Sequence, residues 1–293
     1  MYNPFKEIND DDTGDIEYIS RALNGDLTAL EHLVLRHQSW IFNIAVNMTN
    51  DVDSAQDITQ EVLIKVITKL STYDQGKASF RTWLYRIVAN HFINTKISEK
   101  EKAMSEIAKN HDFDGYCASI PDTRKSLLPG YALAKNETKT ACLQCLLLCL
   151  GRKERLVFVL GAVFGANDRI GSEICGISRV NFRKILSRSR NRVNNFFVRN
   201  CSLVNEDNPC RCSDKTGPLT KLGMINEHNL HASQESESTI GDVVGKSISE
   251  LEDSYYEFNT LFGSQPFYRG PDMTAWFREL LGKSEIKALF NIM

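Results

Sequence analysis

The seven prolines of this chain leave two long stretches in which helices can run without interruption. No proline occurs between Pro4 and Pro121, or between Pro129 and Pro209. Proline removes a backbone donor and clashes with the preceding helical turn, so proline-free stretches favour helices. Both stretches also repeat apolar residues at the spacing of amphipathic helices, and neither contains a convincing run of alternating strand residues. The sequence therefore predicts an all-α protein.

Composition and punctuation divide the predicted helices into two domains and an extension. The chain has 293 residues, of which 42% are hydrophobic and 25% charged, and this length suggests about two domains. A polar stretch with glycines and prolines separates the two helical blocks. We expect a first helical domain at 1–97, a linker at 98–135, a second helical domain at 136–199 and an extension at 200–293.

The first block predicts four helices with recognisable ends. Asn24-Gly25 ends the first helix, and Asp26 can cap the second. Asn50-Asp51 breaks the second helix, and Ser54 is the expected cap of the third. The fourth helix is predicted at Ser79–Phe92.

The second block contains a segregated basic segment. The net charge of the whole chain is only −2, but the segment from Ile174 to Asn205 contains no acidic residue. A basic block of this kind favours a polyanionic partner. Its seven cations are Arg179, Arg183, Lys184, Arg188, Arg190, Arg192 and Arg199.

This basic segment has the pattern of a helix-turn-helix. In EICGISRVNFRKILSRSRNRVNNFF, Gly176-Ile177-Ser178 forms the predicted turn and Ser178 caps the second helix. The first residues of such a helix enter the DNA major groove, and further cations neutralise phosphates. A solvated basic helix in a bundle is the alternative, which the lack of nearby acids disfavours. The candidate DNA-binding residues are Ser178, Arg179, Asn181, Arg183, Lys184 and Arg188.

The third predicted helix has a polar face. Asp57, Glu61 and Lys65 recur every four residues, and Gln60 lies beside them. Glu61 and Lys65 stand in the favourable order for a helical ion pair. By itself such a face is more often solvated than part of an interface.

The fourth predicted helix mixes aromatic and basic residues. Aromatic rings can stack on unstacked bases while arginines hold phosphates, so this mixture suits a single nucleic-acid strand. The preceding loop, Ser71–Ser79, could pocket a flipped base. Core packing is an equally good interpretation of Trp83. The residues predicted to lie off the core stripe are Arg81, Tyr85, Arg86 and Asn90.

Three stretches, in this order, resemble an extracytoplasmic-function (ECF) sigma factor, the promoter-recognition subunit of bacterial RNA polymerase. AQDITQEVLIKV resembles the region 2 helix that docks on the coiled coil of the largest polymerase subunit. ASFRTWLYRIVANHFIN resembles the region that melts and holds the −10 element, and GISRVNFRKILSRSRNRV resembles the region 4 helix for the −35 element. The resemblance covers about Asp26 to Phe197. The chain departs from the family at Gly171, where the first region 4 helix is one residue shorter, and in its long extension.

The resemblance implies core RNA polymerase and promoter DNA as partners, with an anti-sigma protein as a further candidate. The −35 duplex would be bound by the helix-turn-helix residues named above. The residues implied for polymerase docking are Asp57, Gln60, Glu61 and Lys65. Those implied for the −10 strand are Lys77, Arg81, Tyr85, Arg86 and Asn90. Two other functions would use less of this pattern: a stand-alone helix-turn-helix regulator of duplex DNA, and a module held mainly by partner proteins.

The extension begins with a cysteine-rich segment, CSLVNEDNPCRCSDK. Cys201, Cys210 and Cys212 are candidate zinc ligands, with His228 or His231 as the fourth. A redox switch and an inert, packed thiol cluster are the alternatives. Three further cysteines differ, because their spacing places them on the buried stripe of a helix: Cys142, Cys145 and Cys149.

The rest of the extension carries apolar residues that can pack on the two domains or on another protein. Phe262, Phe267, Trp276, Phe277 and Leu289 belong to this set, and the last 23 residues resemble two short amphipathic helices. We hypothesise that the extension is a built-in regulator of access to polymerase or DNA.

Several classes of protein are disfavoured by what the sequence does not contain. The acidic start MYNPFKEINDDD does not resemble a signal peptide, and no apolar run approaches the ~20 residues of a membrane span. We therefore expect a cytoplasmic protein with its eight cysteines reduced. We find no phosphate-binding glycine loop and no nucleophile constellation, so we expect no enzymatic activity and no required cofactor.

Overall fold

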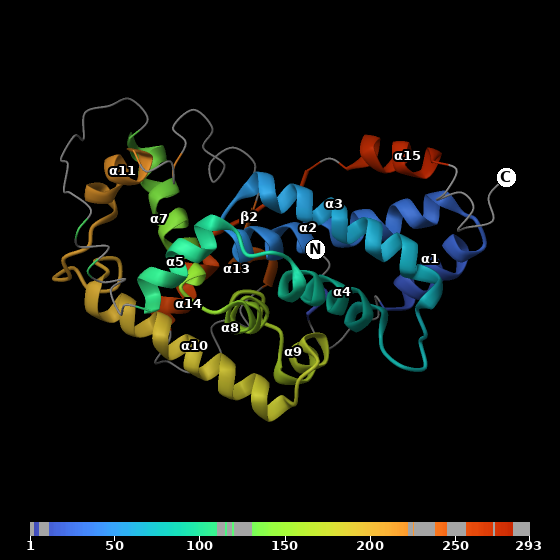
Figure 1. Ribbon diagram of the computed structural model, residues 1–293, viewed down its shortest axis with the longest axis horizontal. Coiled ribbons are helices and arrows are strands. Elements are labelled where there is room, and N and C mark those ends of the chain that lie inside the picture. The colour runs from blue at the N-terminus through green and yellow to red at the C-terminus, as the bar shows by residue number, and fades with distance from the viewer. Residues whose placement is uncertain are drawn as a thin grey trace.

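In the part of the chain that the structure describes, the secondary structure is almost entirely helical, which confirms the all-α prediction (Figure 1). The computed structural model describes residues 3–5, 12–109, 115, 119, 131–221, 225, 238–244, 256–271 and 273–283. Within these ranges the strands are two residues long each: β1 (Ser238–Thr239) pairs antiparallel with β2 (Pro266–Phe267).

The first block consists of four helices, of which α2 is the central one. They are α1 (Asp12–Leu23), α2 (Leu27–Thr49), α3 (Val52–Lys69) and α4 (Phe80–Asn94), with the short 3-10 turn η1 (Leu70–Thr72) after α3. Helices α1, α3 and α4 all contact α2. Ile41 of α2 is fully buried, and the Trp40 ring of the same helix is buried against those of Phe5, Phe164 and Phe267.

Side-chain caps set where these helices begin. Asp26 caps α2 and Ser79 caps α4, each by accepting a hydrogen bond from a backbone amide three residues further on. The prediction that Ser54 caps α3 is wrong by one turn, because Asp51 accepts the hydrogen bond from the Ser54 amide at 2.7 Å. Asn50 adopts a left-handed conformation with φ +52°, which ends α2 and places Asp51 at the cap.

The second block contains the predicted helix-turn-helix. Its elements are α7 (Tyr131–Leu148), α8 (Arg152–Phe158), the π-helical segment η2 (Val159–Val163), α9 (Asp168–Cys175) and α10 (Arg179–Asn200). Gly176 ends α9 with φ +63°, a conformation that glycine adopts at low cost, and Ser178 caps α10. Both features of the predicted turn are confirmed.

The stretch predicted as a polar linker, 98–135, is partly helical. Helix α5 (Glu99–Lys109) begins after Ser98, whose hydroxyl accepts a hydrogen bond from the Glu101 amide at 3.2 Å. Met104 on this helix is buried, so the helix has an apolar face despite its many charges. That face packs against the end of α7, at Cys145, Leu148 and Cys149.

The extension packs on both helical blocks. The helices described in it are α11 (Cys212–Lys221), α13 (Ile240–Val244), α14 (Tyr256–Gly263) and α15 (Thr274–Gly282). Helix α11 contacts α7, α14 contacts η2, and α15 lies along α2 (Figure 1). Phe262, Phe267 and Phe277 are buried in the same apolar core as the two blocks. Leu289 and the second predicted amphipathic helix lie outside the described residues.

Candidate nucleic-acid and polymerase interfaces

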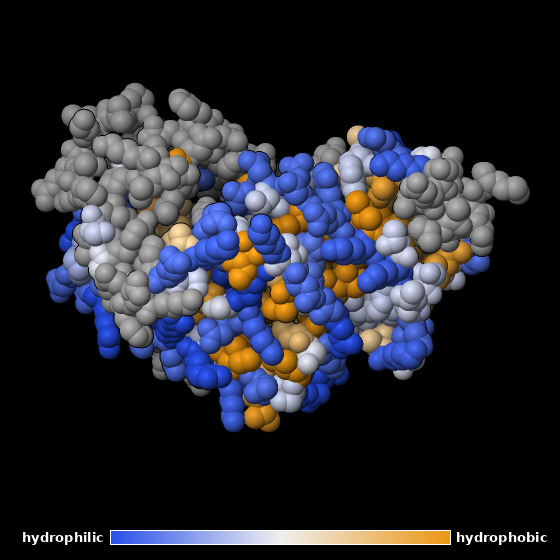
Figure 2. Space-filling model, viewed as in Figure 1, coloured by the Kyte–Doolittle hydropathy of each residue, from blue (hydrophilic) through white to orange (hydrophobic). Residues whose placement is uncertain are grey.

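Helix α10 presents the predicted DNA-binding residues to solvent. Its core side is formed by Phe182, Val193 and other buried residues. Arg183 lies 3.3 Å from Asp168 of α9, but its side chain is 65% exposed, so this ion pair restrains it only weakly. Figure 2 shows mostly hydrophilic colour along the lower edge where α10 runs in Figure 1. The exposed residues of this face are Ser178, Arg179, Asn181, Arg183, Lys184 and Arg188.

Two glycines hold α10 close to the preceding elements. A Cβ atom at Gly171 would lie 2.2 Å from the ring of Phe182, and one at Gly161 would lie 3.2 Å from the same ring. The Phe182 side chain is fully buried between them. Gly171 is unusual for the resembled family. Because it has no side chain, the Phe182 ring of α10 can pack directly against α9 at this position.

Three of the residues predicted to bind a single DNA strand are exposed: two on α4 and one in the loop before it. Arg86 and Asn90 are exposed on α4. Lys77, in the loop before α4, pairs with Asp74 at 3.0 Å, but its side chain is 82% exposed. Lys77 and Asn90 are open to a strand that runs along α4, whereas the Arg86 guanidinium, although exposed, donates to the Glu173 carbonyl of α9 in this structure.

Arg81 and Tyr85 do not lie off the core stripe, and this part of the prediction is wrong. Arg81 is 6% exposed and Tyr85 is 1% exposed. The Tyr85 hydroxyl lies 3.3 Å from His37 Nδ1, and its ring lies 4.9 Å from that of Phe5. Residues on α1, α2 and the N-terminus surround this side of α4, so it is a second core face. In this arrangement neither side chain is open to a DNA strand.

The polar face of α3 is only partly as predicted. Asp57 and Glu61 are exposed, whereas Gln60 and Lys65 are half-buried. Lys65 does not pair with Glu61: its ammonium donates to His91 Nδ1 of α4 at 2.7 Å. Glu61 Oε2 lies 3.9 Å from Nε2 of the same ring. His91 thus links the two helices.

Burial and the neighbouring Lys65 charge lower the pKa of His91 below the ordinary histidine value of about 6.5. Because the unfolded chain then binds a proton more readily, the stabilisation associated with neutral His91 is present above about pH 6.5 and is lost as the pH falls towards the lowered pKa. We expect the stability advantage of the wild-type chain over His91→Gln, which keeps an acceptor for Lys65, to shrink between about pH 7.5 and pH 5.5. Urea unfolding at several pH values measures this difference, and a pH-independent difference would contradict the prediction.

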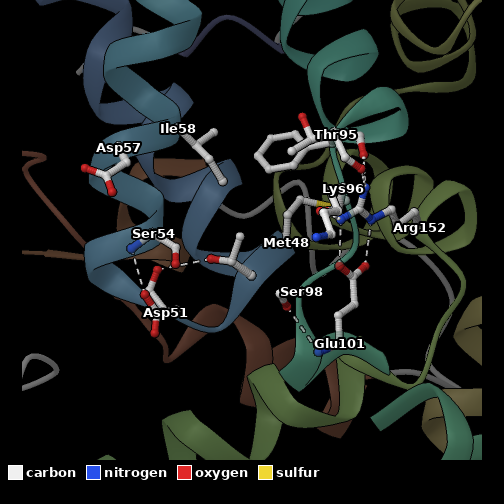
Figure 3. Close-up of a pocket in the computed structure, with 12 residues that line it drawn as sticks. Met48, Asp51, Ser54, Asp57, Ile58, Thr95, Lys96, Ser98, Glu101 and Arg152 are labelled. Atoms are coloured by element: carbon white, nitrogen blue, oxygen red, sulfur yellow. Dashed lines mark hydrogen bonds and ion pairs between the residues drawn. The ribbon is translucent and has the colours of Figure 1, made fainter. Parts of the chain in front are cut away.

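A groove of about 310 Å³ lies beside the polar face of α3. Figure 3 shows Asp51 and Ser54 on one wall and Glu101 and Arg152 on the other, with Asp57 at the rim. Arg152 donates to both carboxylate oxygens of Glu101 at 2.8 Å. It also donates to the Phe92 carbonyl in the last turn of α4 and to the Thr95 and Lys96 carbonyls just after this helix.

This ion pair determines the charge of the groove wall. Burial alone would raise the pKa of Glu101, but the hydrogen bond from Arg152 and the charges of Arg155 and Arg152 hold it below its usual value. Glu101 is therefore ionised near neutral pH and joins α5 to α8. The groove is built from the start of α3, the end of α4 and α8, and it adjoins the predicted docking residue Asp57.

The cysteine-rich segment does not assemble a metal site in the described part of the chain. No three Cys, His, Asp or Glu side chains come together there in a way that could hold a metal ion. The predicted ligand set of Cys201, Cys210 and Cys212 is therefore not gathered, and His228 and His231 lie outside the described residues. Cys201 and Cys210 are neighbours in an isolated β-bridge. Burial raises the pKa of both thiols, which disfavours the thiolates that bind metals.

The described geometry gives the NEDNPCRC pattern a structural role. The side-chain amide of Asn208 donates to three carbonyls at the end of α10, those of Phe197, Val198 and Cys201, at 3.0–3.3 Å. The last carbonyls of a helix have no partner within the helix. Asn208 therefore acts as a C-terminal cap for α10, supplied by the loop that follows it.

Replacing Asn208 by alanine should lower the stability of the chain by about 1–3 kcal/mol, because the Val198 carbonyl loses its donor. The carbonyls of Phe197 and Cys201 each lose one donor and keep backbone amide donors. Asn200→Ala is the matched control, since Asn200 donates only to Phe196 within its own helix. Hydrogen exchange at residues 197–201 should accelerate in the first variant only. Equal effects of the two substitutions would remove the capping role.

In the described ranges no helix has both the length and the hydrophobicity of a membrane span.

Comparison with known proteins identifies the region that contains the candidate docking and strand-binding surfaces. The Sigma-70 region 2 family matches residues 33–100, which include α3, α4 and most of α2.

Individual relatives extend the similarity. The RNA polymerase sigma-H factor of Pseudomonas aeruginosa is 38% identical over 76 residues, covering 26% of this chain and 39% of that protein. The ECF RNA polymerase sigma factor SigE of Mycolicibacterium smegmatis is 23% identical over 67% of this chain and 72% of its own length. The ECF factor SigW of Bacillus subtilis is 29% identical over 48% of this chain and 74% of its own length.

The chain therefore carries a Sigma-70 region 2 domain. Among such proteins it is a relative of the ECF sigma factors, with a C-terminal extension. The chain spans well under half of the Pseudomonas factor that it matches.

Proposed function

We propose that this protein is an ECF-type sigma factor that directs core RNA polymerase to promoters. The observation that carries the proposal is the combination of a Sigma-70 region 2 match with a separate, exposed basic helix in a helix-turn-helix. A duplex-binding regulator alone would not require the region 2 domain. The protein would read the −35 element as duplex and hold the melted −10 element as a single strand.

The segments of the chain are assigned different roles in the proposed function. Residues 1–97 dock on polymerase and hold the −10 strand, 98–135 connect, and 136–199 bind the −35 duplex. Asp57, Gln60, Glu61 and Lys65 form the docking face. Lys77, Arg86 and Asn90 contact the −10 strand, while the buried Arg81 and Tyr85 hold α4 in shape. The −35 face consists of Ser178, Arg179, Asn181, Arg183, Lys184 and Arg188.

The proposal assigns no catalytic residue to the chain, because nucleotide addition would be carried out by the polymerase. It requires no cofactor, and we place the protein in the cytoplasm with its polymerase. An anti-sigma protein is a candidate further partner, since the exposed docking and DNA-binding surfaces are the ones that such a protein would have to cover.

Direct binding to core polymerase tests the proposal. The double variant Asp57→Ala/Glu61→Ala should weaken binding at least tenfold, because it removes two exposed carboxylates from the docking face. Asp53→Ala/Gln56→Ala is the matched control, since both residues are exposed on the same helix. Tight binding that neither variant changes would move the docking face elsewhere. No binding by the wild-type chain would contradict the proposed function.

A further inference from the structure

The C-terminal extension binds α2 through its main chain. Asn43 of α2 is fully buried, and its side-chain amide donates to the Tyr268 carbonyl at 2.7 Å. Its carbonyl oxygen accepts from the Tyr268 amide at 2.9 Å. The Ser39 hydroxyl donates to the next carbonyl, that of Arg269. Both polar atoms of one buried side chain are thus committed to a segment 225 residues away in sequence.

The segment is shaped to fit this place. Gly270 has φ +82°, a conformation that other residues rarely adopt, and a Cβ atom there would lie 3.4 Å from the Ser39 Cα atom. The ring of Phe267 packs against Trp40 with ring centroids 5.0 Å apart. A specific docking site on α2 therefore accommodates Phe267–Gly270.

The same extension also contacts the helix-turn-helix block. The Phe262 ring of α14 lies 5.3 Å from that of Phe158 in α8 and 6.3 Å from that of Phe197 in α10. Only three residues separate Phe262 from the β2 strand that leads to the α2 site. A short length of chain thus bridges the two blocks.

The bridged blocks meet at the face proposed to hold the −10 strand. Arg86 of α4 donates twice to the Glu173 carbonyl near the C-terminus of α9, at 2.6 and 3.2 Å. The Thr82 hydroxyl of α4 donates to Glu173 Oε2 at 3.2 Å. The C-terminal end of a helix carries partial negative charge, which favours a guanidinium there. While this contact persists, Arg86 is not available to a DNA phosphate.

We infer that the extension is an internal brace that keeps the free chain closed: by binding α2 and the helix-turn-helix block together, it holds α9 on Arg86 and blocks the −10 strand. The inference rests on the proposed function for its consequence, but the brace itself is a property of the isolated chain. Opening would then require the extension to leave the α2 site.

Gly270→Ala tests the brace without altering either helical block. Alanine is strained in the left-handed backbone conformation at this position, so the substitution should loosen Phe267–Gly270 from α2. Gly282→Ala is the matched control in the same extension, because a Cβ atom there meets nothing within 4 Å. We expect roughly tenfold faster hydrogen exchange both at 266–270 and at the α4–α9 contact in Gly270→Ala only. A mixed-sequence single-stranded oligonucleotide should bind this variant several-fold more tightly.

A second pair of variants approaches the same contact from α2. Asn43→Ala removes the two hydrogen bonds to Tyr268, whereas Asn47→Ala removes an equally buried amide that donates only within α2. Faster exchange at 266–270 with unchanged protection of the α4–α9 contact would overturn the brace, and so would unchanged exchange at both places. Opening at both places without binding of DNA or polymerase would support the brace and instead contradict the proposed function.

Discussion

Replacing Arg155 by methionine is expected to lower the free energy of unfolding by about 3–5 kcal/mol, the range for breaking a buried ion pair from one side. Arg155 of α8 is only 2% exposed. Its guanidinium donates to the Met48 carbonyl of α2 at 2.5 Å and lies 3.0 Å from Glu101 Oε1 of α5. It also donates to three carbonyls at the end of α7, those of Leu147, Leu148 and Leu150.

The loss is large because one side chain serves three elements besides its own. Methionine preserves much of the apolar stem but leaves the carbonyls and Glu101 without that donor. Arg192→Met is the control, since Arg192 is half-exposed and lies 3.9 Å from its partner Glu154, a geometry worth little. Urea unfolding followed by circular dichroism compares the two variants. Equal losses in both would show that Arg155 does not join the blocks.

Replacing Gly171 by alanine should destabilise the helix-turn-helix by about 1–3 kcal/mol and weaken duplex DNA binding. The added methyl group would lie 2.2 Å from the Phe182 ring. A Cβ atom at Gly161 would likewise lie 3.2 Å from that ring, so there is little free space on either side of it. Because the Phe182 side chain is fully buried, we expect relief of the clash to move α10 away from α9. Such a movement would displace the exposed cations at the start of α10.

Gly151→Ala is the control for this substitution, because its nearest neighbour would lie at an ordinary 3.9 Å. In the double variant Gly171→Ala/Phe182→Leu the ring that meets the methyl group is removed. The double variant should therefore lose less stability than the sum of the losses in the two single variants. Unfolding free energies and fluorescence anisotropy with duplex DNA measure both effects. Purely additive losses would mean that the methyl group does not meet the Phe182 ring.

Local features were predictable from the sequence because they depend on a few neighbouring residues. The cap at Asp26, the turn at Gly176 and the basic face of α10 follow from capping, glycine conformation and charge. The cap of α3 was placed one turn late because Asp51 and Ser54 are both good capping residues. Only the left-handed Asn50 selects Asp51.

Features that depend on distant contacts were not predictable in this way. Tyr85 looks surface-exposed on a single helix, but Phe5 and His37 bury it from other elements. The charged sequence of α5 resembles that of a linker. The helix packs because Arg152 and Arg155, from a distant element, pair with its buried Glu101. The extension's apolar residues indicated a docking segment, but no local pattern indicated Asn43 as its site.

Transcription with purified components tests the central claim most directly. The chain would be mixed with sigma-free core polymerase and fragments of genomic DNA, and the 5′ ends of the transcripts would be mapped. We predict discrete start sites that disappear with Asp57→Ala/Glu61→Ala and persist with Asp53→Ala/Gln56→Ala. If no start sites form, and the chain alone binds duplex DNA with a steep salt dependence, the protein is a stand-alone regulator and not a sigma factor.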